Sequence, residues 1–273
     1  MPELPEVEST RQVLLPILTD NTFHHVMMRR DHLRYPIVLP DHCFPFHIKK
    51  ITRRAKYLII SNSEQQCIVI HLGMSGFLSI HPASHQPLKH DHVIFTLNDE
   101  VILVFNDTRR FGFIQWFNSI DECPWFQHLG FEPLSQKCNI DYLYPLAQQS
   151  KSPIKTFIMN QKNLVGVGNI YASEALFLSG IHPLTPACQI DRQQIKNLLG
   201  HIKNILSRAI QMGGTTLKDY QSPDAKPGYF QQTLLVYNRH NQACSHCGTI
   251  LSLIKINQRQ SVFCSVCQPE HTS

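Results

Sequence analysis

The chain has 273 residues, of which 42% are hydrophobic and 16% are charged, and its formal net charge is +5. This composition excludes a disordered tail protein, and the lack of any apolar run of about 18 residues argues against a membrane span. The modest basic bias is compatible with a polyanionic partner, but it fits an ordinary cytosolic protein equally well. The acidic N-terminus is unlike a secretory signal, so we expect a cytosolic location in which the cysteines stay reduced.

The chain begins Met1-Pro-Glu-Leu-Pro-Glu-Val-Glu8. An initiator Met before a small residue is normally removed, which would leave Pro2 with a free secondary amine. An α-amino group has a reference pKa of about 7.7–8.0, so a sizeable neutral fraction is available as a nucleophile near pH 7. With Glu3 beside it to transfer protons, this amine can form a Schiff base. The same residues also fit a capped helix start, and the apolar spacing predicts a helix over 5–18.

The next part of the chain is predicted to be mostly β structure. Runs rich in Ile, Val, Phe and Leu predict strands over 49–61, 67–80, 92–97 and 101–117. Several short strands with turn residues between them are typical of a sandwich, here with one helix laid across it.

Two polar blocks in this region are not explained by a core. Three cations among the four residues that end at Lys56 suit phosphate contacts, although a solvated strand end is equally consistent with them. The block Lys89-His-Asp-His92 fits a DNA-contacting loop better than a metal site, because a better zinc motif lies near the C-terminus.

Two further blocks suggest a wedge. Met74 lies between two glycines, and Arg109-Arg-Phe-Gly112 exposes cations and an aromatic ring at a turn. A protein that extrudes a nucleotide must fill the space that the nucleotide leaves, and a flexible Met, a planar Arg and a flat Phe suit that purpose. A buried Met that fills a gap in the core is the alternative interpretation of Met74.

The second half is helical in pattern over 135–212. The clearest helix runs from Asp191, a good N-cap, to Met212, and Gly213-Gly214 ends it. The block Asn163–Glu174 predicts two helices joined by a glycine turn, with Asn169 capping the second helix, whose first N–H groups can bind a phosphate. A long irregular loop follows over about 215–230.

The C-terminus carries Cys244-x2-Cys247-x16-Cys264-x2-Cys267, a spacing typical of a zinc ribbon. Four thiolates leave no open coordination position, so we expect one structural Zn²⁺. The tip of the hairpin between the two Cys pairs holds Arg259, which is suited to a DNA groove or a phosphate, or is simply solvated.

Taken together, these motifs resemble the bacterial formamidopyrimidine-DNA glycosylase family, whose members are bifunctional glycosylases and AP lyases for oxidised purines. The resemblance spans nearly the whole chain and includes Gly166-Val-Gly-Asn-Ile-Tyr-Ala-Ser-Glu174, which is similar to the family's helix–two-turns–helix motif. It implies a catalytic set of Pro2, Glu3, Lys56 and Arg259. It also implies a DNA-binding set of His90, Arg109, Met74, Phe111, Lys155, Asn169, Glu6 and Lys151.

The chain departs from the family pattern at two positions that concern DNA. Thr108 replaces the Pro of the usual Asp-Pro-Arg-Arg-Phe-Gly, which predicts a less rigid turn. Ser150 stands where some relatives carry a DNA-contacting Lys, with Lys151 next to it.

The resemblance implies an α+β multidomain fold. Its expected parts are an N-terminal catalytic β-sandwich with flanking helices (1–134), a helix–two-turns–helix domain (135–235) whose loop at about 215–230 covers the lesion, and a zinc ribbon (236–273). The implied partner is double-stranded DNA with oxidised bases, bound by a monomer that works at the bacterial nucleoid, with no membrane involved.

Two other functions share many of these features. An endonuclease VIII-type glycosylase would remove oxidised pyrimidines, and a non-catalytic zinc-ribbon protein would bind nucleic acid without any need for Pro2-Glu3. Removal of Met1 separates the catalytic hypotheses from the binding one, because a retained Met1 blocks the amine.

Overall fold

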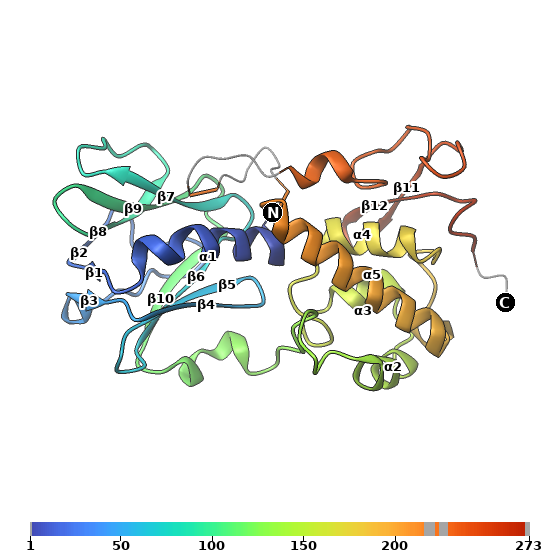
Figure 1. Cartoon of the computed structure of the whole chain (residues 1–273), viewed down its shortest axis with the longest axis horizontal. Helices are drawn as coiled ribbons and strands as arrows, with labels where there is room; N and C mark the ends of the chain where they lie inside the picture. Colours follow the sequence, from blue (N-terminus) through green and yellow to red (C-terminus); the bar gives the residue numbers. More distant parts are fainter. Residues whose placement is uncertain (1, 216–221, 224–228, 271–273) are drawn as a thin grey trace. The chain divides into compact units, whose positions relative to one another are not determined.

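The computed structural model describes residues 2–215, 222–223 and 229–270, and its chain forms two compact units (Figure 1). The first unit comprises Met1–Gln127 with Met212–Gln231, and the second comprises His128–Gln211 with Gln232–Ser273. The loop expected over about 215–230 lies largely outside the described residues.

The first unit is a β-sandwich of two four-stranded antiparallel sheets with one long helix, α1, as predicted. One sheet has the order β2-β8-β9-β7, with bounds His25–Met28, Asp91–Thr96, Val101–Asp107 and Gly76–Pro82. The other has the order β10-β6-β5-β4, with bounds Phe113–Phe117, Cys67–His71, Tyr57–Ser61 and Lys50–Arg54. A small pair, β1 (Thr22–Phe23) and β3 (Phe46–His47), and the short 3₁₀ helices η1 (Asp41–Cys43), η2 (Ile120–Glu122) and η3 (Pro124–Phe126) complete the unit.

Three of the predicted strands are each divided in two. The predicted strand 49–61 turns back at Ala55, which has a left-handed φ of 53°. The predicted strands 67–80 and 101–117 break at 72–75 and 108–112, and in both cases the chain crosses from one sheet to the other. The polar blocks of the sequence therefore lie in the turns where the chain reverses or changes sheet.

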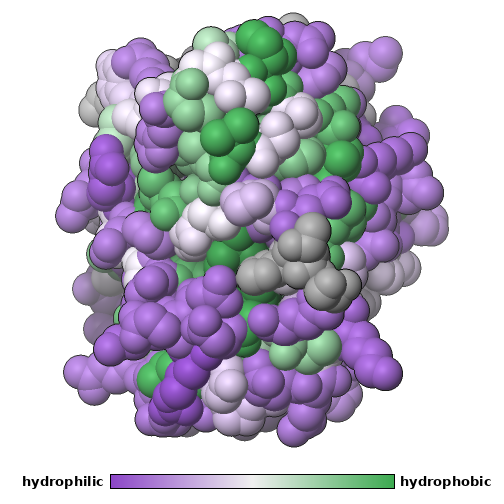
Figure 2. Space-filling model, turned by 90° about the vertical axis from the view of Figure 1, so that its right-hand side faces the viewer, coloured by the Kyte–Doolittle hydropathy of each residue, from purple (hydrophilic) through white to green (hydrophobic). Residues whose placement is uncertain are grey.

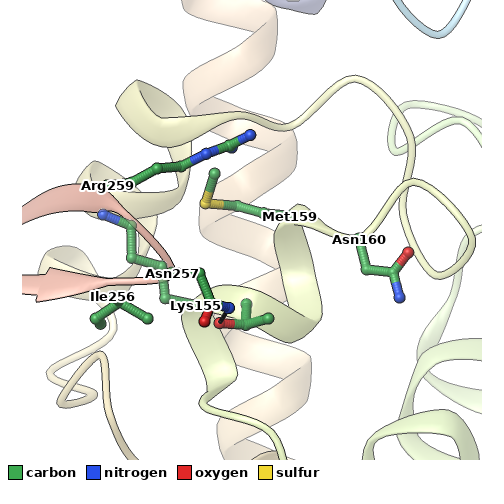
Figure 3. Close-up of a pocket in the computed structure, with 7 residues that line it drawn as sticks. Lys155, Met159, Asn160, Ile256, Asn257 and Arg259 are labelled. Carbon is green, nitrogen blue, oxygen red and sulfur yellow. Dashed lines mark hydrogen bonds between the residues drawn. The ribbon is translucent and has the colours of Figure 1, made fainter.

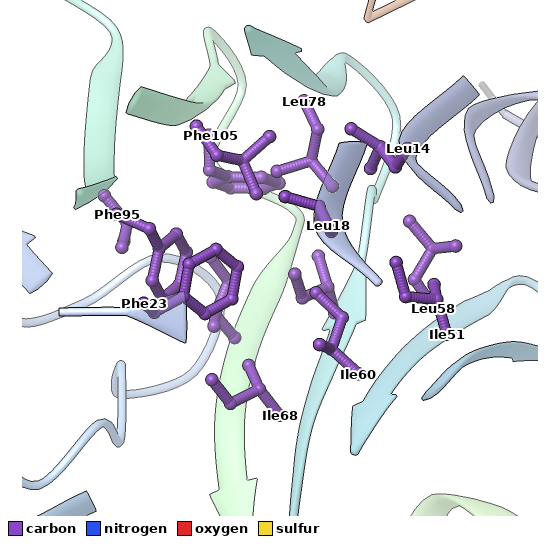
Figure 4. Packing of buried hydrophobic residues seen from close by; sticks show 14 of the residues in the cluster. Leu14, Leu18, Phe23, Ile51, Leu58, Ile60, Ile68, Leu78, Phe95 and Phe105 are labelled. Carbon is purple, nitrogen blue, oxygen red and sulfur yellow. The ribbon is translucent and has the colours of Figure 1, made fainter. Parts of the chain in front are cut away.

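The core of this unit lies between the two sheets and is closed by α1 (Leu4–Leu18). Alternate residues of each strand face inward, as the period of a strand requires, and Leu14 and Leu18 of α1 are fully buried against them (Figure 4). The rings of Phe23 and Phe95 stack with centroids 4.6 Å apart. Pro16 does not end α1, which continues to Leu18.

Over its described residues, the second unit holds four α-helices and one β-hairpin. The helices are α2 (Ile140–Gln148), α3 (Ile154–Met159), α4 (Asn169–Leu178) and α5 (Arg192–Gln211), with the short 3₁₀ helix η4 (Ala187–Gln189). The 3₁₀ helix η5 (Phe230–Thr233) contains the boundary between the two units at Gln231. The hairpin pairs β11 (Ser252–Ile256) with β12 (Arg259–Phe263). The predictions of a helical region and a C-terminal ribbon are confirmed.

The predicted cap of α5 is also confirmed. The Asp191 carboxylate accepts the N–H of Gln194 at 2.7 Å, and the Gln194 side chain accepts the N–H of Asp191 at 3.0 Å. This reciprocal pair satisfies N–H groups that have no partner within the helix. After the helix, Gly213 and Gly214 adopt positive φ angles of 76° and 80°, which suit glycine.

Within the described ranges, no helix combines the length and apolar character that a membrane crossing requires. On the face shown in Figure 2, hydrophilic residues surround smaller hydrophobic areas.

Candidate functional site

The N-terminal motif is buried and held by Glu6. Pro2 is buried and Glu3 is 1% exposed at the N-cap of α1. The Glu6 carboxylate accepts the Glu3 N–H at 2.8 Å through Oε2 and the Thr215 N–H at 2.8 Å through Oε1. Glu6 is itself 1% exposed, and its two carboxylate oxygens fix the backbone at Glu3 and at Thr215.

The segment after α5 approaches Glu6 closely. A Cβ added at Gly214 would lie 3.2 Å from Glu6 Oε1, so the backbone there packs directly on the carboxylate. Gly214 thus serves a close approach as well as the end of the helix.

Lys56 lies in the two-residue turn between β4 and β5 and is half-buried. Of the neighbouring cations, Arg53 is bound internally, because its Nε donates to Glu8 at 2.9 Å and its guanidinium also donates to the Ala55 carbonyl at 2.9 Å. Arg53 therefore braces the turn that presents Lys56.

His71 has no role among the predictions from the sequence. Its Nδ1 accepts the Gly73 N–H at 3.0 Å, and its ring stacks on Phe113 with centroids 5.8 Å apart. Burial, followed by the charges of Lys56 and Arg34, lowers the pKa of His71 to about 4. The ring is therefore neutral at pH 7, and its remaining proton is on Nε2. The signal that the sequence offers is a His three residues before Met74, at the start of the same block; the structure adds that His71 pairs with Tyr57, the residue after Lys56.

Met74, Arg109 and Phe111 are brought together by two turns in contact. Met74 is half-buried, whereas Arg109 is exposed and Phe111 is 40% exposed. The Arg109 guanidinium lies over the Phe111 ring, 5.1 Å from its centroid. Arg110 between them adopts a left-handed φ of 58°.

His90 lies beside this region and is half-buried. Its carbonyl oxygen accepts the Asp107 N–H at 3.0 Å, and its ring lies 6.3 Å from that of His92. Among the described residues, the only group of side chains arranged to hold a metal is the C-terminal set of cysteines. The alternative of a metal site at Lys89–His92 therefore has no support in the described part of the chain.

In the second unit, Lys155 on α3 is 2% exposed. Its Nζ donates to the hydroxyls of Ser173 at 2.8 Å and Ser261 at 2.7 Å, which belong to α4 and the hairpin strand β12. The lysine therefore joins three elements that are distant in sequence. Lys151, by contrast, is exposed, and the neighbouring Ser150 hydroxyl lies 2.8 Å from that of Ser152.

The prediction that Asn169 caps α4 was wrong. The N-cap is Gly168, and Asn169 is the first helical residue. Its side-chain amide instead donates to the Gln260 carbonyl at 3.0 Å, because the hairpin lies close enough to take this donor.

The hairpin tip presents Arg259 beside α3 (Figure 3). Asn257 and Gln258 form the tip with left-handed φ angles of 45° and 63°, and the Asn257 amide donates to the Thr156 hydroxyl at 3.0 Å. A pocket of about 270 Å³ lies here, with Lys155 and Arg259 among its lining residues. Arg259 is exposed, so its guanidinium is accessible to a ligand.

The four predicted zinc ligands form one cluster. The Sγ atoms of Cys244, Cys247, Cys264 and Cys267 all lie within 4.8 Å of one another. The Cys247–Cys264 and Cys244–Cys267 Sγ distances are 3.4 and 3.9 Å. Zn–S bonds of about 2.3 Å in a tetrahedron place sulfurs about 3.8 Å apart, so the cluster fits one Zn²⁺. With four thiolates the site is closed and structural.

Glu174 is a second residue without a predicted role. It is 3% exposed, and its carboxylate accepts the N–H groups of Leu235, Val236 and Tyr237 at 2.8–2.9 Å. Burial raises the pKa of this carboxyl, against the lowering effect of the three N–H groups. Glu174 thus ties α4 to the segment that leads into the zinc-binding hairpin.

Comparison with known proteins finds family models that match three stretches of the chain. Residues 1–114 match the formamidopyrimidine-DNA glycosylase N-terminal domain, and residues 129–221 match its H2TH domain. Residues 241–269 match a zinc finger found in FPG and IleRS.

Similar full-length proteins carry the same name. A formamidopyrimidine-DNA glycosylase of Xylella fastidiosa is 47% identical, over 98% of this chain and 100% of the relative. One of Xanthomonas campestris is 46% identical with the same coverage. The crystal structure of MutM (FPG) from Thermus thermophilus matches with a TM-score of 0.89 at 33% identity, covering 98% and 99% of the two chains. The Lactococcus lactis Fpg in complex with DNA containing an abasic site matches with a TM-score of 0.88 at 29% identity, covering 98% and 100%. With its N-terminal Pro-Glu, its β-sandwich, its helical unit and its four-cysteine hairpin, the chain belongs to the formamidopyrimidine-DNA glycosylase family.

Proposed function

We propose that this protein is a base-excision-repair DNA glycosylase with AP lyase activity that removes oxidised purines, such as 8-oxoguanine and formamidopyrimidines, from duplex DNA. The observation that carries the proposal is the Pro2-Glu3 pair, buried at the start of α1 and held through the Glu6 carboxylate. A binding protein has no need of such a pair, whereas Schiff-base chemistry needs a positioned amine with an acid beside it.

The proposed reaction begins at the amine of Pro2 once Met1 has been removed. Its nitrogen attacks C1′ of the damaged nucleotide while the glycosidic bond breaks and the base leaves with a proton, and the sugar ring opens to an iminium ion. The iminium acidifies C2′, whose proton is lost as the 3′ phosphate leaves, and the 5′ phosphate leaves in a second elimination. Hydrolysis of the imine frees Pro2. Glu3 transfers the protons in these steps.

The remaining predicted residues divide by exposure. The exposed Arg109, Phe111, Arg259 and Lys151 contact DNA, with half-buried Met74 completing the wedge. Lys56 and His90 bind the backbone, and His71 joins them as a neutral donor through Nε2.

We assign the two buried members of the predicted DNA-binding set, Glu6 and Lys155, and the half-buried Asn169 to positioning. Glu6 holds the N-terminal motif, and Lys155 and Asn169 hold the hairpin that carries Arg259. The Zn²⁺ stabilises this hairpin and takes no part in the chemistry.

The proposal extends to the setting of the reaction. The protein acts as a monomer on double-stranded DNA at the nucleoid, in the cytoplasm, and its chain divides functionally at about 134 and 235. The curated relatives from Xylella fastidiosa and Xanthomonas campestris, both named formamidopyrimidine-DNA glycosylase, support the bacterial setting.

Oxidised pyrimidines are the second class of substrate to test. A complex of the Lactococcus lactis Fpg with DNA containing an oxidised pyrimidine is among the structures that this chain resembles, with a TM-score of 0.89. The names of the curated relatives favour the purine lesion as the main substrate.

Borohydride trapping tests the proposal. The protein is incubated with a duplex carrying 8-oxoguanine opposite cytosine, and the crosslinked peptide is mapped by mass spectrometry. We expect a crosslink on Pro2 together with strand nicking, loss of base excision in Pro2→Gly, and normal trapping in Pro5→Ala, which changes a proline of the same turn. A trimmed N-terminus and measurable duplex binding without any crosslink would rule out the oxidised-purine lyase. A crosslink obtained only with an oxidised-pyrimidine duplex would favour the endonuclease VIII type.

A further inference from the structure

The two turns that carry Met74 and Arg109 are joined by a single hydroxyl. Ser75 is 4% exposed, and its Oγ donates to Asp107 Oδ1 at 2.7 Å. The same Oγ accepts the backbone N–H of Arg109 at 2.9 Å. Because Ser75 follows Met74 directly, one side chain fixes the position of both wedge residues relative to each other.

Asp107 extends this connection to the other loops of the region. It is 0% exposed, and its second carboxylate oxygen accepts the Gly112 N–H at 2.8 Å. Its backbone N–H donates to the His90 carbonyl at 3.0 Å, and its carbonyl accepts from His92 Nε2 at 2.8 Å. The turn of residues 108–112 is therefore bound to the buried carboxylate directly at Gly112 and through the Ser75 hydroxyl at Arg109.

The two turns also touch through their backbones. A Cβ at Gly73 would lie 2.7 Å from the Phe111 carbonyl oxygen and closer still to the Gly112 nitrogen, so no side chain fits between the turns. A Cβ at Gly112 would in turn lie 2.7 Å from the His71 carbonyl oxygen. With glycines on both sides, neither turn can shift without moving the other.

We propose that Ser75 is a positioning residue that couples Met74 to Arg109, so that both turns enter the duplex as one rigid wedge. Loops that order only on binding lose conformational entropy at that moment, whereas a wedge ordered beforehand does not. Thr108, in place of the family's proline, predicts a less rigid turn. In the proposed coupling, the Ser75 hydroxyl and the buried Asp107 carboxylate hold this turn without a proline. This inference rests on the proposed function, since it concerns the step that opens a base pair.

Comparison of three substrates tests the coupling. The first is a duplex with 8-oxoguanine opposite cytosine, the second has the lesion opposite an abasic analogue, and the third carries an abasic site in place of the lesion. Single-turnover rates are measured for the wild type, Ser75→Ala, and the matched control Ser79→Ala, which removes a hydroxyl from β7, the strand that follows Ser75.

We expect Ser75→Ala to slow excision of the paired lesion roughly five- to tenfold, the effect of a hydrogen bond or two lost on the way to the extruded state. The defect should shrink below about twofold on the unpaired lesion and on the abasic site, because neither substrate has an intact base pair that must be opened. Ser79→Ala should match the wild type on all three. Ser75→Cys, nearly the same size but weaker in hydrogen bonding, should lie between wild type and Ser75→Ala. If a thermal melt shows that Ser75→Ala is not folded, Ser75→Cys still provides the test.

Two results would overturn the inference. Equal slowing on all three substrates would assign Ser75 a general structural role, and an unchanged rate on the paired lesion would show that the turns insert independently. Failure of the proposed function looks different, because the wild type itself would then not excise the lesion from any duplex.

Discussion

Replacing Glu6 with Gln tests whether this residue contacts DNA, as the resemblance implies, or positions the catalytic motif. The change keeps the size of the side chain but removes its charge and one of its two acceptor oxygens. In the native chain these oxygens accept the N–H groups of Glu3 and Thr215, both at 2.8 Å, and Glu6 is 1% exposed. In the variant, one of the two N–H groups therefore faces an NH₂ group.

The expected cost follows from these contacts. A hydrogen bond to a charged group contributes about 1.5–3 kcal/mol, and a buried donor left without a partner costs about 1–3 kcal/mol. One bond is lost outright and the other loses its charge, so we expect Glu6→Gln to lower the free energy of unfolding by about 2–4 kcal/mol. Because the Glu3 N–H belongs to the peptide bond with Pro2, Schiff-base trapping should fall at least about tenfold, whereas duplex affinity should change less than about threefold.

Urea unfolding at pH 7.5, borohydride trapping and duplex titration measure the three quantities. Glu64→Gln is the control, since it makes the same chemical change at an exposed position of the same unit and should shift stability by less than about 0.5 kcal/mol. A variant with wild-type stability and trapping but weak duplex binding would refute the positioning role and restore the DNA contact.

Other predictions concern His71, Glu174 and the zinc site. Because the pKa of His71 is about 4 in the folded state and 6.5 as a reference value, its contribution to stability is complete above pH 6.5 and is lost as the pH falls toward 4. The loss amounts to about 3 kcal/mol, and His71→Gln should remove this part of the pH dependence of urea unfolding; an unchanged slope would contradict it. Cys264→Ser should lower the metal content below one Zn per chain by mass spectrometry and expose the hairpin to protease, whereas Cys188→Ser, outside the cluster, should do neither. Glu174→Gln should destabilise the chain by about 2–4 kcal/mol, since three N–H groups share its carboxylate; a cost below about 1 kcal/mol would mean that they find other partners.

Elements governed by local chemistry could be predicted from the sequence. The helix α5 follows from its apolar stripe, from the Asp191–Gln194 cap and from the glycines after it, all within a few residues. The zinc cluster follows from the spacing of its two Cys-x-x-Cys pairs. Each of these signals is short-range, so no knowledge of the rest of the fold is needed to read it.

The long strands were predicted less well because a strand pattern does not show where the chain changes sheet. Residues on both sides of 72–75 and of 108–112 have the same apolar, β-branched and aromatic character, and they keep it after the crossing. What breaks the strands is the contact between the turns at Gly73 and Gly112, which are distant in sequence. Periodicity carries no information on such a contact.

The same limit applies to the site. A resemblance identifies which residues matter, but it does not separate those that touch DNA from those that hold them in place. Glu6 meets Thr215 across 209 positions, and Lys155 meets Ser261 across 106, so the burial of both depends on the tertiary fold. Arg259 is exposed next to the hairpin tip, a position that the local sequence already indicates.

The division has a consequence for how variants of the site should behave. Loss of an exposed contact such as Arg259 should weaken the complex with DNA and leave the unfolding free energy almost unchanged, because a surface substitution costs little. Loss of a buried group such as Lys155 should lower both, because the hairpin that presents Arg259 depends on it. Exposure in the fold, rather than membership of a motif, therefore determines which measurement reports on each residue.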